Sequence, residues 1–283
     1  MPRQKEGMSH NKPSRGAAAV VTGAGSGIGR AFALELARRG GRVVCADIKL
    51  DTAQETAQLI ADGGGEAFAL SCDVGRLEAV QALAQQAPEL LGTPVDLVIN
   101  NAGIGIGGKH IGEFGIDDWR ATMDVNLWGV IHGCHVFTPQ LRQLGRGGIL
   151  NVASTASFAA APSMGPYNVT KAAVLALTET LAAELAGSGV RVSALCPTFV
   201  KTNILRDGRI EAGVTRLASR LMSWTGVDAG RVARQALDAL DRGQLYMLPQ
   251  LDARMIWRLK RLMPESYGRG AGALGRLLNR GAG

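Results

Sequence analysis

Short apolar segments alternate with segments of helical spacing along most of this chain, and this alternation limits its fold more than any other feature. Each apolar segment is followed by a stretch in which apolar residues recur every three or four positions. Uninterrupted apolar strands joined by helices are typical of a parallel sheet with right-handed crossovers. The predicted strands are 17–21, 42–46, 66–71, 95–99, 148–153, 191–195 and 245–248.

We therefore predict a single α/β domain over residues 17–249, with a doubly wound parallel sheet of the Rossmann type. The sheet should have about seven strands, with helices on both faces, and long helices are expected over 117–144 and 166–186. Hydrophobic residues make up 46% of the chain and aromatic residues only 5%, which favours a core of small aliphatic side chains.

The positive charge lies in the two ends of the chain. The formal net charge is +7, of which residues 1–16 carry +3 and residues 250–283 carry +5, so the predicted domain carries −1. We interpret 1–16 as a flexible basic N-terminal tail and 250–283 as a basic amphipathic C-terminal extension. Because the basic residues are outside the domain, nucleic-acid binding is disfavoured.

The four cysteines lie far apart in apolar segments and are expected to be buried, reduced thiols without metal-binding spacing. No apolar run is long enough to span a bilayer, and the N-terminal residues lack the apolar core of a signal peptide. These features predict a cytoplasmic protein.

A glycine-rich turn follows the first predicted strand. Gly23, Gly27 and Gly29, with Ser26 and Ile28 between them, lie where the strand passes into a helix. Backbone N–H groups and the positive end of the helix dipole at such a turn can bind a pyrophosphate. The flanking strand and helix therefore predict a dinucleotide site.

Acidic residues end the next two predicted strands. Asp47 lies 18 residues after Gly29, where a carboxylate can accept hydrogen bonds from the adenosine ribose and repel a 2′-phosphate. This favours NAD over NADP, although Lys49 weakens the exclusion, and Asp47 could instead cap the following helix. Asp73 and Val74 are expected near the adenine, or else in an ordinary turn.

Five motifs together resemble the short-chain dehydrogenase/reductase family over about residues 17–248. They are Thr22-Gly23-xxx-Gly27-x-Gly29, Asn100-Asn101-Ala102-Gly103, Asn126, Ser154, and Tyr167-x-x-x-Lys171. The resemblance implies an NAD(P)-dependent oxidoreductase acting on CH–OH groups, with Asn126, Ser154, Tyr167 and Lys171 as its catalytic residues. It also implies cofactor contacts from Asn101, Ala102, Gly103, Tyr167, Lys171, Pro197, Val200 and Thr202.

The spacing of Tyr167 and Lys171 suits the implied chemistry, because residues four apart share one face of a helix. We expect the Lys171 ammonium and the nicotinamide charge to lower the pKa of Tyr167, which would exchange a proton with the substrate. Ser154 would donate a hydrogen bond to the substrate oxygen, and Asn126 would anchor a water that links Lys171 to solvent. The family often has Pro-Gly where this chain has Pro197-Thr198.

The expected walls of the substrate site are apolar, which predicts a hydrophobic secondary alcohol or ketone. The wall residues are Ile104, Ile106, Phe158, Met164, Phe199, Leu221, Met222 and Trp224. Two alternatives are an NADP(H)-dependent carbonyl reductase and a non-catalytic dinucleotide-binding sensor or scaffold. A mobile substrate flap is expected between residues 202 and 227.

The C-terminal extension shows a helical stripe that includes Leu251, Met255 and Leu262, with arginines at other positions. Such a helix can pack on the protein or on a neighbouring subunit, or it can lie on an anionic membrane. The family resemblance also implies a homodimer or homotetramer, assembled through the long helices 117–144 and 166–186.

Overall fold

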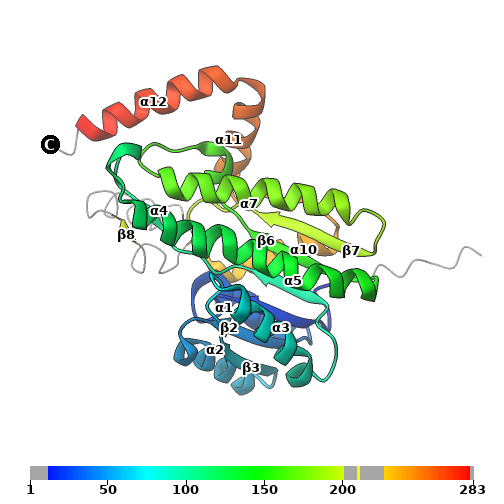
Figure 1. Ribbon diagram of the computed structural model, residues 1–283. Coiled ribbons are helices and arrows are strands. Elements are labelled where there is room, and N and C mark those ends of the chain that lie inside the picture. The colour runs from blue at the N-terminus through cyan, green and yellow to red at the C-terminus, as the bar shows by residue number, and fades with distance from the viewer. Residues whose placement is uncertain (1–11, 201–208, 211–225, 281–283) are drawn as a thin grey trace, which may run out of the picture.

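The computed structural model describes residues 12–200, 209–210 and 226–280 (Figure 1). Seven parallel strands form one sheet in the order β3-β2-β1-β4-β6-β7-β9, which confirms the predicted doubly wound fold. The strands are β1 (Ala18–Thr22), β2 (Arg42–Asp47), β3 (Glu66–Ser71), β4 (Leu97–Asn100), β6 (Gly147–Val152), β7 (Val190–Leu195) and β9 (Tyr246–Met247). A second, two-stranded sheet pairs β5 (Ile106–Gly107) with β8 (Arg209–Ile210).

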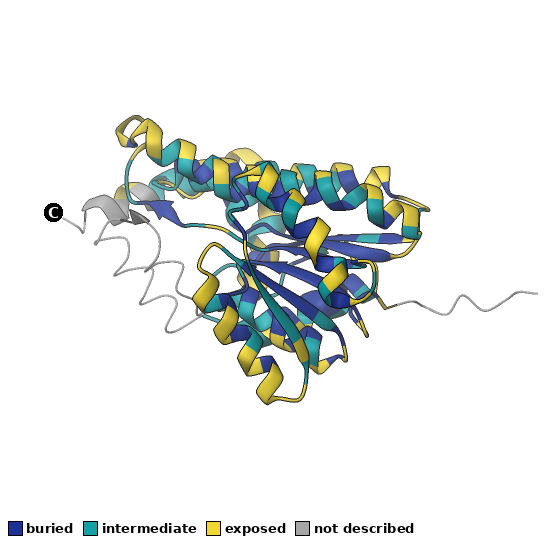
Figure 2. Ribbon diagram, turned by 60° about the horizontal axis from the view of Figure 1, so that its bottom comes forward, coloured by how far each residue is buried: buried dark blue, intermediate teal, exposed yellow. Residues whose placement is uncertain are grey.

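Helices cover both faces of the large sheet, and the buried strands lie between them (Figure 2). Side chains alternate between the two faces, so Ala18 and Val20 enter one core while Ala19 and Val21 enter the other. The first core is closed by α3 (Leu77–Leu91), α5 (Gly129–Leu144) and α7 (Gly165–Glu184). The second is closed by α1 (Gly27–Arg38), α2 (Leu50–Asp62) and α10 (Ala229–Asp241).

The helix predicted over 117–144 contains a π-helical turn. It consists of α4 (Ile116–Met123), the π-turn Asp124–Trp128 and α5. Asn126 lies in this turn and is fully buried, and its side chain bonds to the backbone of Ile104 rather than to its own helix. Such π-turns occur often at functional sites.

The described part of the chain begins inside the segment expected to be a flexible tail. Ser14 is fully buried, and its backbone N–H and hydroxyl donate to the two carboxylate oxygens of Asp241, at 3.0 and 2.7 Å. Arg39 donates to Ser14 Oγ and forms ion pairs with Glu35, Asp238 and Asp241. These bonds fasten residues before Gly16 to α1 and α10.

The C-terminal residues form two helices, α11 (Leu251–Leu262) and α12 (Pro264–Arg280), of which α12 projects from the body (Figure 1). The buried side of α11 is centred on Ala253, while the leucine stripe predicted from the sequence is exposed. Leu251 is 71% exposed, Met255 63% and Leu262 80%. Among the described residues, no helix combines the length and apolarity needed to cross a bilayer.

Candidate active site

The residues predicted to form the site lie at the carboxyl ends of the parallel strands. The strand order reverses direction between β1 and β4, and ligands of doubly wound sheets bind in the crevice at such a point. The glycine turn follows β1, Asn101 follows β4, and Ser154 follows β6. The fold therefore brings the nucleotide motif and the proposed catalytic motif to the same edge of the sheet.

The β1–α1 turn has the conformation that its glycines permit. Gly23 has φ +64° and Gly27 has φ +54°, which side-chain-bearing residues rarely adopt. At Gly29 an added Cβ would collide with the carbonyl oxygen of Gly23 and crowd the side-chain amide of Asn101. Ser26 is exposed at the N-cap of α1 without a side-chain cap bond, and the partly buried Ile28 packs on the core.

Two residues missed by the sequence analysis brace this turn. Thr56 on α2 donates its hydroxyl to the carbonyl oxygen of Ala24 at 2.9 Å, and Arg30 Nε donates to Thr56 Oγ1 at 3.0 Å. Arg30 also donates to the carbonyl oxygen of Gly25. The sequence shows Thr56 only as a helical residue, so its role could be found only from the packing of α2 against the turn.

Asp47 lies at the end of β2, beside the glycine turn. One of its carboxylate oxygens accepts from the backbone N–H of Gly25 at 2.9 Å, and the other accepts from that of Lys49 at 3.0 Å. Because a carboxylate offers about four acceptor positions, both oxygens can still accept ligand hydroxyls. The turn, the N-terminus of α1 and Asp47 together fit the pyrophosphate and ribose of a dinucleotide.

The two residues expected near the adenine differ in accessibility. Asp73 is partly exposed, and its side chain accepts from the backbone N–H of Gly75 at 3.0 Å, as in an ordinary Asx turn. Val74 is buried and packs on Gly129. A Cβ added at Gly129 would lie 2.7 Å from Cγ2 of Val74. His132 Nδ1 lies 2.9 Å from the Val74 carbonyl oxygen.

The segment after β4 is bonded to the glycine turn. The Asn101 amide donates to the Thr22 carbonyl oxygen at 2.8 Å, while Thr22 Oγ1 accepts from the backbone N–H groups of Asn101 and Ala102. Gly103 lies next to the catalytic candidates, since an added Cβ there would lie 3.5 Å from Lys171 Nζ. Asn101 therefore helps to shape the turn, which its motif did not reveal.

Ser154, Tyr167 and Lys171 come together from the end of β6 and the first turns of α7. Lys171 is 3% exposed; its ammonium lies 5.8 Å from the centre of the Tyr167 ring and donates to the Val152 carbonyl oxygen at 2.8 Å. The hydroxyl of Ser154 acts on Tyr167, whose phenolate it favours. The triad predicted from the sequence is therefore assembled in one place.

Burial controls the protonation of this cluster. It raises the pKa of Tyr167 above its usual value, and the hydrogen bond from Ser154 opposes that rise only in part. Burial also lowers the pKa of Lys171 to about 8, against a smaller opposing effect of Cys196. The expected lowering of the Tyr167 pKa is therefore wrong for the protein's own groups, because desolvation of the phenolate outweighs the effect of Ser154.

Asn126 lies close to this cluster and is bonded to the backbone of Ile104. Its Oδ1 accepts from the Ile104 N–H at 2.7 Å, and its Nδ2 donates to the Ile104 carbonyl oxygen at 2.9 Å. Oδ1 would lie 3.1 Å from a Cβ at Gly103, the glycine that also borders Lys171. This placement orients the segment after β4 beside Lys171.

The segment after β7 lies against Ser154. The Pro197 carbonyl oxygen accepts from the backbone N–H of Thr155 at 2.9 Å and from Ser154 Oγ at 3.5 Å. Val200 is buried and forms a bridge with Val227. Thr202 lies outside the described residues.

The described part of the predicted substrate wall consists of Ile104, Ile106, Phe158, Met164 and Phe199. Met164 meets Gly107, whose added Cβ would collide with the methionine sulfur, and the Gly108 N–H donates to the Ser163 carbonyl oxygen at 2.8 Å. The loops after β4 and α6 (Ala156–Ala159) thus lie in contact. Leu221, Met222, Trp224 and nearly all of the expected flap lie outside the described residues.

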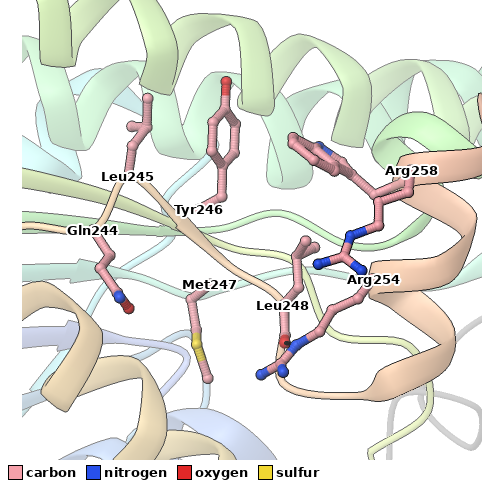
Figure 3. A pocket seen from close by; sticks show the side chains of 8 residues that line it. Gln244, Leu245, Tyr246, Met247, Leu248, Arg254 and Arg258 are labelled. Atoms are coloured by element: carbon pink, nitrogen blue, oxygen red, sulfur yellow. Dashed lines mark hydrogen bonds between the residues drawn. The ribbon is translucent and has the colours of Figure 1, made fainter. Parts of the chain in front are cut away.

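A cavity of about 510 Å³ lies elsewhere, between β9 and α11 (Figure 3). Its walls are Gln244, Leu245, Tyr246, Met247, Leu248, Arg254, Trp257 and Arg258. None of the predicted catalytic or cofactor residues lines it, so this cavity is separate from the candidate active site.

Comparison with known proteins agrees with this geometry. The family model described as short chain dehydrogenase matches residues 17–212. The probable oxidoreductase EphD of Mycobacterium tuberculosis is 42% identical over 186 residues, which cover 65% of this chain but only 31% of that relative's length. The 1-deoxy-11-beta-hydroxypentalenate dehydrogenase of Streptomyces exfoliatus is 34% identical over 259 residues, covering 88% of this chain and 91% of the relative.

Among solved structures, a short chain dehydrogenase/reductase from Burkholderia phymatum in complex with NAD is 36% identical, with a TM-score of 0.84. The match covers 89% of this chain and 95% of that one. The family match spans well over half of the present chain, and the sheet order and strand-end motifs agree with it. The chain therefore belongs to the short chain dehydrogenase family of oxidoreductases, with the nicotinamide-dinucleotide-binding Rossmann fold of that family.

Proposed function

We propose that this protein transfers a hydride between NAD(H) and a hydrophobic secondary alcohol or ketone. The observation that carries the proposal is the convergence of Ser154, Tyr167 and Lys171 beside Gly103, at the edge of the sheet that also bears the glycine turn. A non-catalytic sensor would not need a half-buried tyrosine beside a buried lysine at this point.

In alcohol oxidation, Tyr167 accepts the hydroxyl proton, and in ketone reduction it returns that proton. Ser154 donates a hydrogen bond to the same substrate oxygen as charge develops on it. The Lys171 ammonium stabilises the phenolate of Tyr167, and Asn126 anchors a water that links Lys171 to solvent. When bound, the nicotinamide ring supplies or accepts the hydride.

We assign NAD in preference to NADP because of Asp47. Its carboxylate lies beside the turn that would hold the pyrophosphate, and a 2′-phosphate placed there would meet a negative charge. The nearby Lys49 is exposed and belongs to the same turn, so it is the feature that favours the NADP(H) alternative. The Burkholderia phymatum relative in complex with NAD supports the first assignment.

A titration with NADH and NADPH tests the cofactor assignment. NADH should bind more tightly, and Asp47→Ala should weaken NADH binding by about 10- to 100-fold while affecting NADPH far less, because charged hydrogen bonds to the ribose are lost. Asp51→Ala, on the exposed first turn of α2, is the matched control. Tighter NADPH binding by the wild type would overturn the assignment in favour of a carbonyl reductase.

Turnover tests the catalytic assignment. With NAD⁺ and a panel of lipophilic secondary alcohols, Tyr167→Phe should lower kcat by about 10²- to 10⁴-fold, with a far smaller effect on NADH binding. The 1-deoxy-11-beta-hydroxypentalenate dehydrogenase named above supports including hydroxypentalenate in this panel. Equal turnover by the wild type and Tyr167→Phe would contradict the role of Tyr167, and NADH binding without turnover of any substrate would support the sensor.

Two surfaces support the expected assembly into homo-oligomers. Trp128, in the π-turn before α5, and Val169, on α7, are 48% and 47% exposed despite being large and apolar. These are the helices through which the family resemblance implies subunit contact. Light scattering should report a dimer or tetramer, and Val169→Glu should dissociate it if α7 lies in the interface.

The exposed apolar residues Leu251, Met255 and Leu262 of α11 support contact of this cytoplasmic enzyme with a membrane surface. Arg254, Arg258 and Arg261 are exposed along one side of the apolar row, which suits an anionic lipid surface. The protein should co-sediment with anionic but not zwitterionic vesicles, and Leu251→Ser with Met255→Ser should abolish this. Leu59→Ser, on a 47% exposed leucine of α2, is the control; unchanged sedimentation of the double variant would refute the contact.

A further inference from the structure

The segment after β7 is bonded to the start of α11, about fifty residues later in the chain. Gln250 is 8% exposed, and its Oε1 accepts from the Thr198 N–H at 3.1 Å while its Nε2 donates to the Phe199 carbonyl oxygen at 3.0 Å. One buried amide therefore satisfies both a donor and an acceptor of this loop. Buried amides with both ends bonded fix the backbone to which they bind.

The hydroxyl of Thr198 extends this contact toward the catalytic serine. It donates to Asp252 Oδ1 at 3.1 Å and lies 3.2 Å from Thr155 Oγ1. Because the Thr198 hydroxyl has one proton and Asp252 accepts it, the second bond takes its proton from Thr155, whose hydroxyl also lies 3.4 Å from the Cys196 carbonyl oxygen. A chain of hydrogen bonds thus runs from the residue after Ser154, through Thr198, to α11. The glycine often found after this proline in the family could not form it.

A second contact reaches the same segment from α12. Tyr267 Oη donates to the Ala159 carbonyl oxygen at 2.8 Å, and Lys260 Nζ lies 6.0 Å from the centre of the Tyr267 ring. Ala159 ends the short helix α6, and the next residue, Ala160, has φ +50°. Burial raises the pKa of Tyr267, so its hydroxyl remains a proton donor at neutral pH.

We propose that α11 and α12 are a brace for the catalytic serine. Thr198, held by Gln250 and Asp252, fixes one end of the segment Ser154–Ala159, and Tyr267 fixes the other. These are positioning residues: they act through Ser154 and the adjoining wall of the substrate site. The expected loss of turnover rests on the proposed function. The fixed position of residues 154–159 does not.

The brace predicts that turnover falls when the Thr198 hydroxyl is removed and is kept when the hydroxyl is kept. Thr198→Val keeps the size of the side chain and the backbone bond to Gln250, and should lower kcat by about 5- to 30-fold, because the hydrogen bonds to Asp252 and Thr155 are both lost. Thr198→Ser restores the hydroxyl and should restore kcat. NADH affinity should change less than kcat in both variants, because the backbone bond to Gln250 still holds the loop that bears the implied cofactor contacts Pro197 and Val200.

The second contact has a matched control. Tyr267→Phe should lower kcat or raise KM for the alcohol several-fold, whereas Tyr246→Phe should not. Tyr246 also bonds through its hydroxyl, to Glu179 Oε1 at 2.7 Å, but it does not reach α6. The variant Asp252→Ala should resemble Thr198→Val, and the double variant should be no worse than either single variant.

Hydrogen–deuterium exchange measures the brace without turnover. Amides of residues 155–160 should exchange faster in Thr198→Val and in Tyr267→Phe, and at the wild-type rate in Thr198→Ser and Tyr246→Phe. Unchanged exchange in the first two variants would overturn the brace even in an active enzyme. Faster exchange in a protein that turns over no alcohol would uphold the brace while the proposed reaction fails.

Discussion

The β1–α1 turn and the β7 loop both border the candidate active site, but they are held in different ways. The turn takes its shape from glycines within it and from residues of the next helix, such as Thr56 on α2. The β7 loop takes its position from Gln250 and Asp252 at the start of α11. The turn is therefore held by residues close to it in sequence, and the β7 loop by a distant helix. Substitutions in the two regions should therefore affect NADH binding and kcat differently.

The largest effect is expected at the turn itself. Gly29→Val should abolish NADH binding and lower the free energy of unfolding by about 3 kcal/mol or more, because no rotamer avoids the collision of Cβ with the Gly23 carbonyl group. Gly63→Ala is the control, since φ there is −82° and an added Cβ has only ordinary contacts. Urea unfolding and NADH titration measure both, and normal binding by Gly29→Val would remove the turn from the site.

A matched pair of variants tests the contrast directly. Thr56→Val removes the side-chain donor of the Ala24 carbonyl oxygen, and Gln250→Leu removes the acceptor of the Thr198 N–H, so each should destabilise the fold by about 1 to 3 kcal/mol. We expect Thr56→Val to weaken NADH binding several-fold with little change in kcat at saturating cofactor. Gln250→Leu should mainly lower kcat. The same kinetic pattern in both variants would erase the distinction between the two regions.

A smaller effect is expected on the pH dependence of stability, and it comes from Lys171 on the β6–β7 side of the site. Its pKa of about 8 in the native state lies below the ordinary 10.5, so the unfolded state binds more protons between these values. Its contribution to stability therefore rises with pH above about 8, by about 1.4 kcal/mol for each pH unit.

The buried cysteines act in the opposite direction above pH 9, because burial raises the pKa of each thiol to about 11 or 12. The comparison is therefore between the wild type and Lys171→Met at pH 8 and pH 9, by urea unfolding. The stability difference should shift toward the wild type by about 1 kcal/mol as pH rises. A constant difference would mean that Lys171 keeps an ordinary pKa, and its role beside Tyr167 would need revision.

The sequence predicted the fold and the location of the site well, because both depend on local patterns. Apolar runs placed the seven strands to within about two residues, and strand-end motifs necessarily meet at one edge of a parallel sheet. It misjudged the direction in which the protein's own groups shift the Tyr167 pKa, since desolvation depends on everything packed around the phenol. It also predicted a leucine stripe on α11 without indicating that this stripe faces outward.

What the sequence by itself determined is the order of the strands and helices, the glycine turn, and the spacing of Tyr167 and Lys171 on one helix face. Neighbouring residues determine these features through backbone sterics and helical periodicity. Only the tertiary structure decided that Ser14 is buried against Asp241, that Thr56 braces the turn, and that Tyr267 reaches Ala159. Tyr267 and Ala159 are 108 residues apart. No local pattern encodes such a contact, because it exists only once the sheet and both cores have brought the two segments together.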